Sequence, residues 1–297
     1  MSGVFHRGEL AVQQRMGQGD TAERVGRIVR SDIPPAAAAF LAEQPMIVVA
    51  AADDDGRMWT SLIVGSPGFA HAHDAHTIVI DGLPVPGDPL AKALRRPRRV
   101  GMIALEPQRR RRMRVNGTAL PVGDGLRIET DQVYSNCPKY ISRRRIEESQ
   151  VDTGHPQIRQ SAALDEAQRR AITSADTFFV GSSAADGNAD ASHRGGNPGF
   201  VQVLTPTRLR WPDYPGNSMF MTLGNIHENP RCGLLFPDWR TGATLQLTGT
   251  AQIIWDRAAF TPGAQCAIEF TIAEAVDITN ASPLHWGAAE LSPVNPT

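Results

Sequence analysis

The sequence predicts a mainly β fold with small helices, built from two tandem copies of one small barrel. Short apolar runs, at 200–204, 233–236 and 245–247, lie between clusters of Gly, Pro, Asn and Asp. This pattern is typical of antiparallel strands joined by tight turns. The 22 prolines and 27 glycines also favour short strands and many turns. The third observation is an internal repeat, which predicts the two copies.

The repeat is visible as matching segments at a nearly constant spacing. Pro67-Gly68-Phe69 recurs as Pro198-Gly199-Phe200, an offset of 131 residues. Further along, residues 101–119 align without a gap on residues 233–251, at an offset of 132. Apolar residues alternate at matching positions in the two segments, as they do in half-buried strands. The sequence therefore predicts equivalent strands in both copies.

Each copy is expected to begin with a helix followed by a strand. Pro34-Pro35 opens a helix through Leu41 in the first copy, and residues 46–51 form its first strand. The counterparts in the second copy are a helix at 164–172 and a strand at 177–181. These elements predict an N-terminal helical segment at 1–30, a first barrel at 31–140, a linker at 141–160 and a second barrel at 161–297.

Composition limits the class of protein. With 41% hydrophobic and 21% charged residues, the chain resembles an ordinary soluble globular protein, and its net charge of −1 argues against one that coats nucleic acid. No apolar run approaches the length of a membrane span, and the start of the chain is not a signal peptide, so we expect a cytoplasmic protein. The three cysteines have no metal-binding spacing.

The segment 191–199 combines groups that could hold a phosphate. Ser192 supplies a hydroxyl, His193 an imidazole and Arg194 a guanidinium, while Gly195 and Gly196 free the backbone to approach an anion. A guanidinium is the best phosphate partner of these, because it offers two parallel N–H donors. A solvated turn is the alternative interpretation.

This segment is one of several that resemble the flavin-nucleotide-binding family related to pyridoxamine 5′-phosphate oxidase. The resemblance also rests on Phe5-His6, Gly8-Glu9, Gln13, Trp211-Pro212-Asp213-Tyr214, Thr222-Leu223-Gly224-Asn225, Asn229-Pro230-Arg231, Asn136-Cys137-Pro138-Lys139-Tyr140 and Pro283-Leu284. It implies FMN-binding split barrels, in which FMN lies between two barrels. A tandem copy could supply that interface within one chain. Because the first copy has Ser61-Leu62-Ile63 where the second has Ser192-His193-Arg194, we expect one working cleft.

The resemblance implies a set of FMN-binding residues. Beside residues 192–196 it includes Asn217, Thr222 and Asn225, with turn chemistry as their alternative, and Thr244 or Gln246 at the flavin edge. If a helix starts at Pro138, Lys139 and Arg143 share one face and could meet a phosphate. Trp211, Trp239 and Trp286 could cover the ring or belong to the core. His193 and Tyr140 are the candidate acid–base residues.

Two arginine clusters stand out, at 95–99 and 109–112. We rank a solvated hairpin tip first for the second cluster, because the repeat places it over a strand-connecting turn. Attraction of an anionic cofactor by Arg112 and Arg114 ranks second, and nucleic-acid binding third.

The predicted function is an FMN-dependent oxidoreductase that acts on a small molecule. Electrons would come from NAD(P)H, from a separate reductase or from the substrate itself. The alternative is a non-catalytic flavin- or haem-binding split-barrel protein, because a fold does not determine a function. The chain could also form a homodimer.

Overall fold

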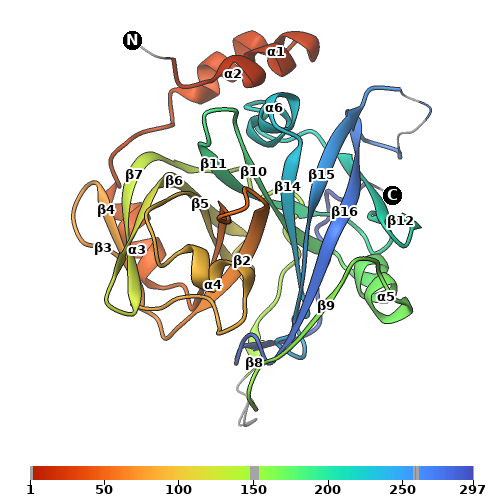
Figure 1. The fold of residues 1–297 in the computed structure, drawn as a ribbon. Coiled ribbons are helices and arrows are strands. Elements are labelled where there is room, and N and C mark those ends of the chain that lie inside the picture. Colours follow the sequence, from red (N-terminus) through yellow and green to blue (C-terminus); the bar gives the residue numbers. More distant parts are fainter. Residues whose placement is uncertain (1–2, 148–153, 257, 259–260, 297) are drawn as a thin grey trace.

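The computed structural model describes residues 3–147, 154–256, 258 and 261–296. Figure 1 shows two β-sheet units side by side, with two N-terminal helices lying over one end of the molecule. These helices are α1 (Arg7–Arg15) and α2 (Gly19–Gly26). Part of the predicted linker, residues 148–153, lies outside the described residues. No helix in the described part of the chain is long and apolar enough to cross a membrane.

The first unit is a seven-stranded antiparallel sheet with the order β2-β1-β5-β6-β7-β4-β3. Its elements are α3 (Pro35–Ala42), β1 (Met46–Ala52), β2 (Met58–Val64), β3 (Ala70–Ala72), β4 (Thr77–Ile80), α4 (Pro89–Ala93), β5 (Arg98–Glu106), β6 (Arg111–Val122) and β7 (Gly125–Ser135). Alternate side chains of β1, such as Ile47 and Val49, enter a core closed by Phe40 and Leu41 of α3.

The second unit has the path β11-β10-β14-β15-β16-β13-β12, with β9 added beside β16. Its elements are β9 (Gln157–Ser161), α5 (Glu166–Ser174), β10 (Thr177–Ser183), β11 (Ala189–Gly195), β12 (Gln202–Thr205), β13 (Arg208–Asp213), α6 (Met221–Glu228), β14 (Arg231–Pro237), β15 (Thr244–Ile254) and β16 (Cys266–Thr279). Two short strands, β8 (Ile146–Glu147) and β17 (His285–Trp286), pair separately.

The two strand orders are the same when β1–β7 are matched with β10–β16 in chain order. Even the irregularities correspond, because β6 has a register shift between Asn116 and Gly117 and β15 has one between Thr248 and Gly249. These positions differ by the 132 residues of the repeat. The predicted fold, two tandem split barrels in a mainly β chain, is therefore confirmed.

The barrels pack against each other across an approximate two-fold axis. A Cβ on Gly101 of β5 would collide with the backbone of Asp190 in β11, and a Cβ on the equivalent Gly233 of β14 would collide with the backbone at Trp59 in β2. Glycine at both positions allows this close approach of the two backbones. Buried apolar residues from both barrels, including Met58 and Phe179, form the core between them.

The segment after the first barrel differs from the prediction. The prediction of a helix starting at Pro138 is wrong, since residues 136–145 contain no helix. Tyr140 has a φ of 65°, a left-handed conformation that interrupts helical backbone. The segment instead runs along the second barrel, where the Tyr140 carbonyl occupies the space that a side chain at Gly195 would need.

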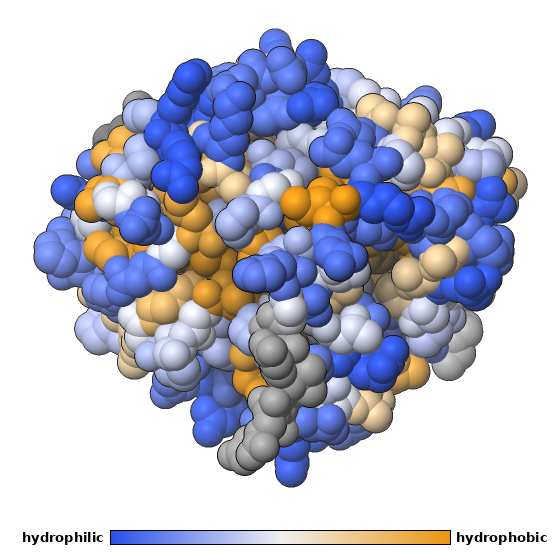
Figure 2. Space-filling model, turned by 60° about the horizontal axis from the view of Figure 1, so that its bottom comes forward, coloured by the Kyte–Doolittle hydropathy of each residue, from blue (hydrophilic) through white to orange (hydrophobic). Residues whose placement is uncertain are grey.

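The opposite end of the molecule is shown in Figure 2. Most residues of this face are hydrophilic, and hydrophobic residues gather toward its middle. Exposed apolar side chains near this end include Ile146 of β8 and Ile158 of β9. The N-terminal helices lie over the other end of the molecule, and the pocket described next opens between the barrels.

Candidate functional site

A pocket between the two barrels has a cavity volume of about 90 Å³ and is open to solvent. The second barrel contributes β11, the end of β13 and the start of α6, and the first barrel contributes the start of β6 and the segment after β7. The residues that line it include Arg112, Arg114, Asn136, Tyr140, Ser192, His193, Arg194, Gly195, Asp213, Tyr214, Asn217, Phe220 and Thr222.

Three arginines converge on this pocket, and two of them have acidic partners. Arg114 forms a buried ion pair with Asp190. Arg194 lies 3.3 Å from a carboxylate oxygen of Asp213. Arg112 forms no ion pair within the described residues. Burial, followed by repulsion from Arg114 and Arg194, lowers the pKa of Arg112 to about 9. The pocket therefore holds a cation that an incoming anion would stabilise.

His193 is the neighbour of this unpaired arginine. Arg112 Nη1 lies 3.0 Å from His193 Nδ1. Burial and the nearby arginines lower the pKa of His193 well below its ordinary value, so the ring is neutral. Because a guanidinium only donates, Nδ1 is the acceptor and Nε2 carries the proton. This Nε2 is buried and has no partner among the described residues.

The N-terminus of α6 points its free amides toward the same space. The residue before the helix, Phe220, has a φ of 58° and offers no side-chain cap. The hydroxyls of Ser192 and Thr222 lie beside it, 3.0 Å apart and both buried. A helix N-terminus without a cap leaves its first backbone N–H groups free to bind an anion. Cations, hydroxyls and backbone amides thus meet at one end of the pocket.

Aromatic and amide groups form the other wall. The rings of Tyr140 and Tyr214 lie 5.3 Å apart at 35°. The Tyr140 hydroxyl donates to the carbonyl of Pro215, which holds the segment after β7 against the second barrel. Asn217 donates to the side chain of Asn136 at 3.3 Å. The wall thus offers an aromatic face and polar groups to a flat heterocycle.

The cleft related by the two-fold axis has the opposite character. Asp88 is the N-cap of α4 and accepts hydrogen bonds from the Leu90 amide at 2.8 Å and from the Ser61 hydroxyl at 2.6 Å. Gln246 of the second barrel donates to the same carboxylate at 2.9 Å. Leu62, which follows Ser61, and Trp239 line a small space of only about 10 Å³. This cleft is closed.

The structure brings together part of the predicted site. Ser192, His193, Arg194, Gly195, Asn217, Thr222 and Tyr140 all line the cationic pocket. Gly196 follows directly but donates its amide to the carbonyl of Asp176. Asn225 lies one helical turn beyond Thr222 and faces away, toward Ser182 and His6.

Other predicted site residues lie elsewhere. Gln246 faces the closed cleft, where it contacts Asp88, because the two-fold axis places β15 of the second barrel there and β6 of the first barrel at the cationic pocket. Thr244 lines a different pocket, together with Arg144 and Gln168. Lys139 does not line the cationic pocket, and Arg143 pairs with Glu290 at 3.4 Å. Without a helix at Pro138 the two side chains have no common face.

The tryptophans and arginine clusters have structural roles in the described chain. Trp211 is buried in the second barrel core, and Trp239 packs at 86° on Trp286 beside the closed cleft. In the cluster 109–112, Arg109 and Arg111 pair with Glu106. The prediction of a solvated hairpin tip therefore holds for Arg109 and Arg111, whereas Arg112 enters the pocket. In the cluster 95–99, Arg98 pairs with Asp54 and Arg99 with Asp131.

Sequence reasoning missed Phe220, Asp213 and Tyr214 as pocket residues. Asp213 and Tyr214 stood within a segment of the family resemblance but carried no chemical signal of their own. The signal for Phe220 was available in the repeat, since an offset of 132 aligns it with Asp88, a residue typical of helix N-caps.

Comparison with known proteins identifies the second barrel. Residues 164–283 match the family model described as pyridoxamine 5′-phosphate oxidase. The family relationship predicted from the motifs is thus confirmed. No curated protein matches the chain.

Solved structures of similar proteins resemble only part of the chain. One is a putative pyridoxamine 5′-phosphate oxidase from Lactobacillus delbrueckii, with 18% identity, a TM-score of 0.33, and coverage of 39% of this chain and 94% of its own. Another is an FMN-binding protein from Syntrophomonas wolfei, with 7% identity, a TM-score of 0.30, and coverage of 37% and 84%. HupZ from Group A Streptococcus has 12% identity, a TM-score of 0.29, and coverage of 37% and 90%.

Proposed function

We propose that the cationic pocket binds FMN and that the protein is an FMN-dependent oxidoreductase acting on a small molecule. The observation that carries the proposal is Arg112, a cation without an acidic partner in the described chain, which lines the same pocket as the uncapped N-terminus of α6. A phosphate would supply the missing negative charge and accept from the free amides. The family of the second barrel supports the choice of a phosphorylated cofactor.

The described side chains fit the parts of FMN. Arg112 and Arg194 would hold the phosphate, together with the hydroxyls of Ser192 and Thr222. Tyr140 and Tyr214 offer apolar contact to a flat ring system. The amides of Asn136 and Asn217, which line the same pocket, can donate to and accept from the polar edge of such a ring.

Bound flavin would supply the electron chemistry, namely transfer of a hydride or of single electrons. The chain's own groups bind and orient it. His193 is neutral and keeps its Nε2 proton, so it can donate a hydrogen bond but is a poor base at neutral pH. Electrons would reach the flavin from NAD(P)H, from a separate reductase or from the substrate.

The absorbance spectrum of the purified protein tests the proposal. We expect bands near about 370 and 450 nm, generic for an oxidised flavin, and their loss when NADPH or NADH is added without oxygen. A protein that keeps the flavin bands after each nicotinamide cofactor would take its electrons from a separate reductase or from the substrate. An intense Soret band, or no chromophore after incubation with FMN, would contradict flavin binding.

A further inference from the structure

A second polar pocket lies on the other side of the cationic pocket's wall. It has a cavity volume of about 510 Å³ and is bounded by the N-terminal segment, β5 to β7 of the first barrel, and β11 and α6 of the second. Met221 lines both pockets. The ion pair of Arg114 and Asp190 forms the partition, because Arg114 lines the cationic pocket and Asp190 lines this one.

The second pocket carries an excess of negative charge. Its two arginines are already neutralised, since Arg99 pairs with Asp131 at 2.7 Å and Arg30 pairs with Asp32 at 2.5 Å. Asp186 lines the pocket and contacts only amide groups of Asn188 among the described residues. The remaining acid is Glu9.

Glu9 is a buried carboxyl group with one oxygen left over. Its side chain is 6% exposed, and Oε2 accepts from the His6 amide at 2.8 Å in the capping box of α1. Its Oε1 has no hydrogen-bond partner among the described residues. This oxygen is free to accept a hydrogen bond from a ligand in the pocket that Glu9 lines.

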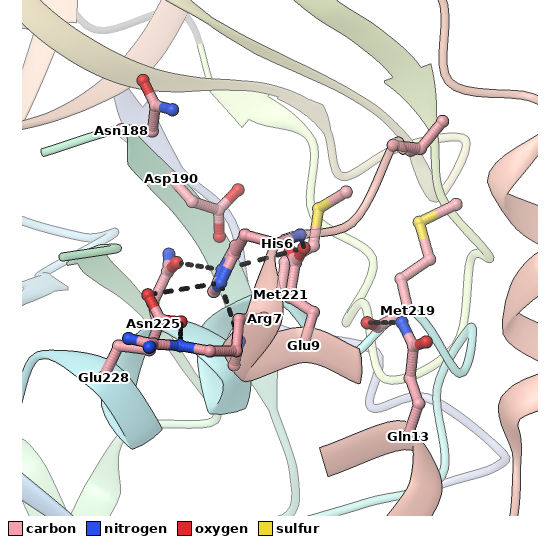
Figure 3. A network of polar contacts seen from close by, with 12 residues as sticks. His6, Arg7, Glu9, Gln13, Asn188, Asp190, Met219, Met221, Asn225 and Glu228 are labelled. Carbon is pink, nitrogen blue, oxygen red and sulfur yellow. Dashed lines mark hydrogen bonds and ion pairs between the residues drawn. The ribbon is translucent and has the colours of Figure 1, made fainter. Parts of the chain in front are cut away.

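Figure 3 shows how the surrounding groups converge. His6 lies at the centre, with Asn225 and Glu228 on one side, Glu9 and Met221 close to it and Asp190 above. His6 Nε2 contacts Asn225 Oδ1 at 3.0 Å, which anchors the N-terminal segment to α6. The backbones of the two helices approach closely at Gly8 and Gly224. The carboxyl groups are thus held by packed elements of three regions of the chain.

We infer that this second pocket binds an organic cation, recognised by Glu9 and Asp190 on one side and by side-chain amides on the other. The inference goes beyond the proposed function and does not depend on flavin binding. A protonated amine or a guanidinium brings the N–H donors that Oε1 of Glu9 lacks. The unpaired Oδ1 of Asn116, which lines the pocket, accepts from the same kind of group.

An organic cation suits this pocket better than a metal ion or an anion. The described residues contain no group of three His, Cys, Asp or Glu side chains arranged to hold a metal ion. An anion would face the carboxylate of Asp186, which has no cationic partner among the described residues, and would oppose ionisation of Glu9, whereas the cationic pocket next door offers arginines. The two pockets therefore select ligands of opposite charge.

Isothermal titration calorimetry with four probes tests the inference. The probes are putrescine, spermidine, cadaverine and agmatine, with butane-1,4-diol as the neutral match to putrescine. We expect at least one cation to bind to the flavin-free protein and the diol not to bind. The Glu9→Gln variant keeps the capping box through its amide oxygen and should weaken that binding about tenfold or more, because one charge-assisted hydrogen bond is lost.

Glu228→Gln is the matched control. Glu228 also contacts His6, at 3.5 Å, and pairs with Arg7, but it does not line the second pocket. The control should bind the cation as the unaltered protein does. Failure of all four probes to bind, or equal losses in the two variants, would overturn the inference. Neither result bears on the flavin bands, so the two proposals fail independently.

Proton release gives a second readout. Burial, with the nearby charges of Asp190 and Glu228, raises the pKa of Glu9 to about 8, against the lowering effects of the His6 amide and Arg114. At pH 7 the group is therefore mostly protonated, and a bound cation should ionise it. Titrations in two buffers of different ionisation enthalpy should show release approaching one proton in the unaltered protein and none in Glu9→Gln. Equal proton release in both would contradict the role of Glu9.

Discussion

The two clefts of this molecule differ at one decisive position, the residue before a short helix. In the closed cleft this residue is Asp88, whose carboxylate caps α4 and occupies the place where an external anion would bind. In the cationic pocket the equivalent residue is Phe220, which has no side chain to cap α6. The same anion-binding geometry is thus filled internally in one copy and left open in the other.

The surrounding residues have diverged in step with this position. Ser61 and Ser192 are equivalent, but Gln246 stands where the other cleft has Arg114 and Leu62 where it has His193. An amide suffices to satisfy Asp88, because the carboxylate already has two other donors. An open site needs cations instead. After duplication, both clefts have therefore kept the same backbone geometry, but in one of them a single internal carboxylate, that of Asp88, occupies the anion-binding position.

The largest effect is expected from placing the internal anion in the open cleft. Phe220→Asp should weaken FMN binding by several kcal/mol, because a carboxylate beside the phosphate introduces like-charge repulsion. Phe220→Asn offers a similar cap without the charge and should retain much more affinity. Flavin fluorescence titration measures both. Equal affinities in the two variants would mean that the α6 N-terminus does not face the phosphate.

The next largest effect distinguishes Arg112, which has no acidic partner among the described residues, from Arg194, which pairs with Asp213. Arg112→Ala and Arg194→Ala should each lower FMN affinity by about 1.5–3 kcal/mol, the usual worth of a hydrogen bond to a charged group. Only Arg194→Ala should also lower the free energy of unfolding, because it leaves the buried Asp213 without its cation. Urea denaturation of the flavin-free variants checks this. A large loss of stability in Arg112→Ala would show that Arg112 has a structural partner.

The smallest effect concerns the closed cleft alone. Burial raises the pKa of Asp88 to about 6. A raised carboxyl pKa means that the native state holds its proton more tightly than the unfolded state. The contribution of Asp88 to the free energy of unfolding is therefore fully present below about pH 4. It falls by about 1–3 kcal/mol as the pH rises to about 6. Asp88→Asn should flatten this part of the stability curve measured by denaturation at several pH values, and an unchanged curve would contradict the assignment.

Much of the fold could be predicted because its signals are local or repeated. Proline and glycine turns marked the strand ends, and the match of residues 101–119 with 233–251 identified equivalent strands, down to the same register shift. The segment at Pro138 was predicted wrongly because the i, i+4 spacing of Lys139 and Arg143 is meaningful only on a helix. There the contact of Tyr140 with the second barrel overrides local propensity.

The site was predicted less completely, since its chemistry depends on pairing across the barrels. Ser192, His193 and Arg194 stood out as a cluster, but Arg112 looked like one member of a solvated run. Its neighbours Arg109 and Arg111 find glutamates at the surface, whereas Arg112 turns inward beside His193. Alternation along β6 sends its side chains to opposite faces of the sheet, and only the second barrel decides what the inward face meets.

By itself the sequence determined that the chain is duplicated, that each copy is a small β-barrel and that Arg194 stands in a phosphate-compatible segment. These properties depend on periodicity and on residue types within a few positions. Only the tertiary structure decided which cleft is open, which arginine lacks an acid and that a second, acidic pocket adjoins the first. The physical reason is that burial and charge compensation arise between residues far apart in the chain, such as Asp88 with Gln246 and Arg114 with Asp190.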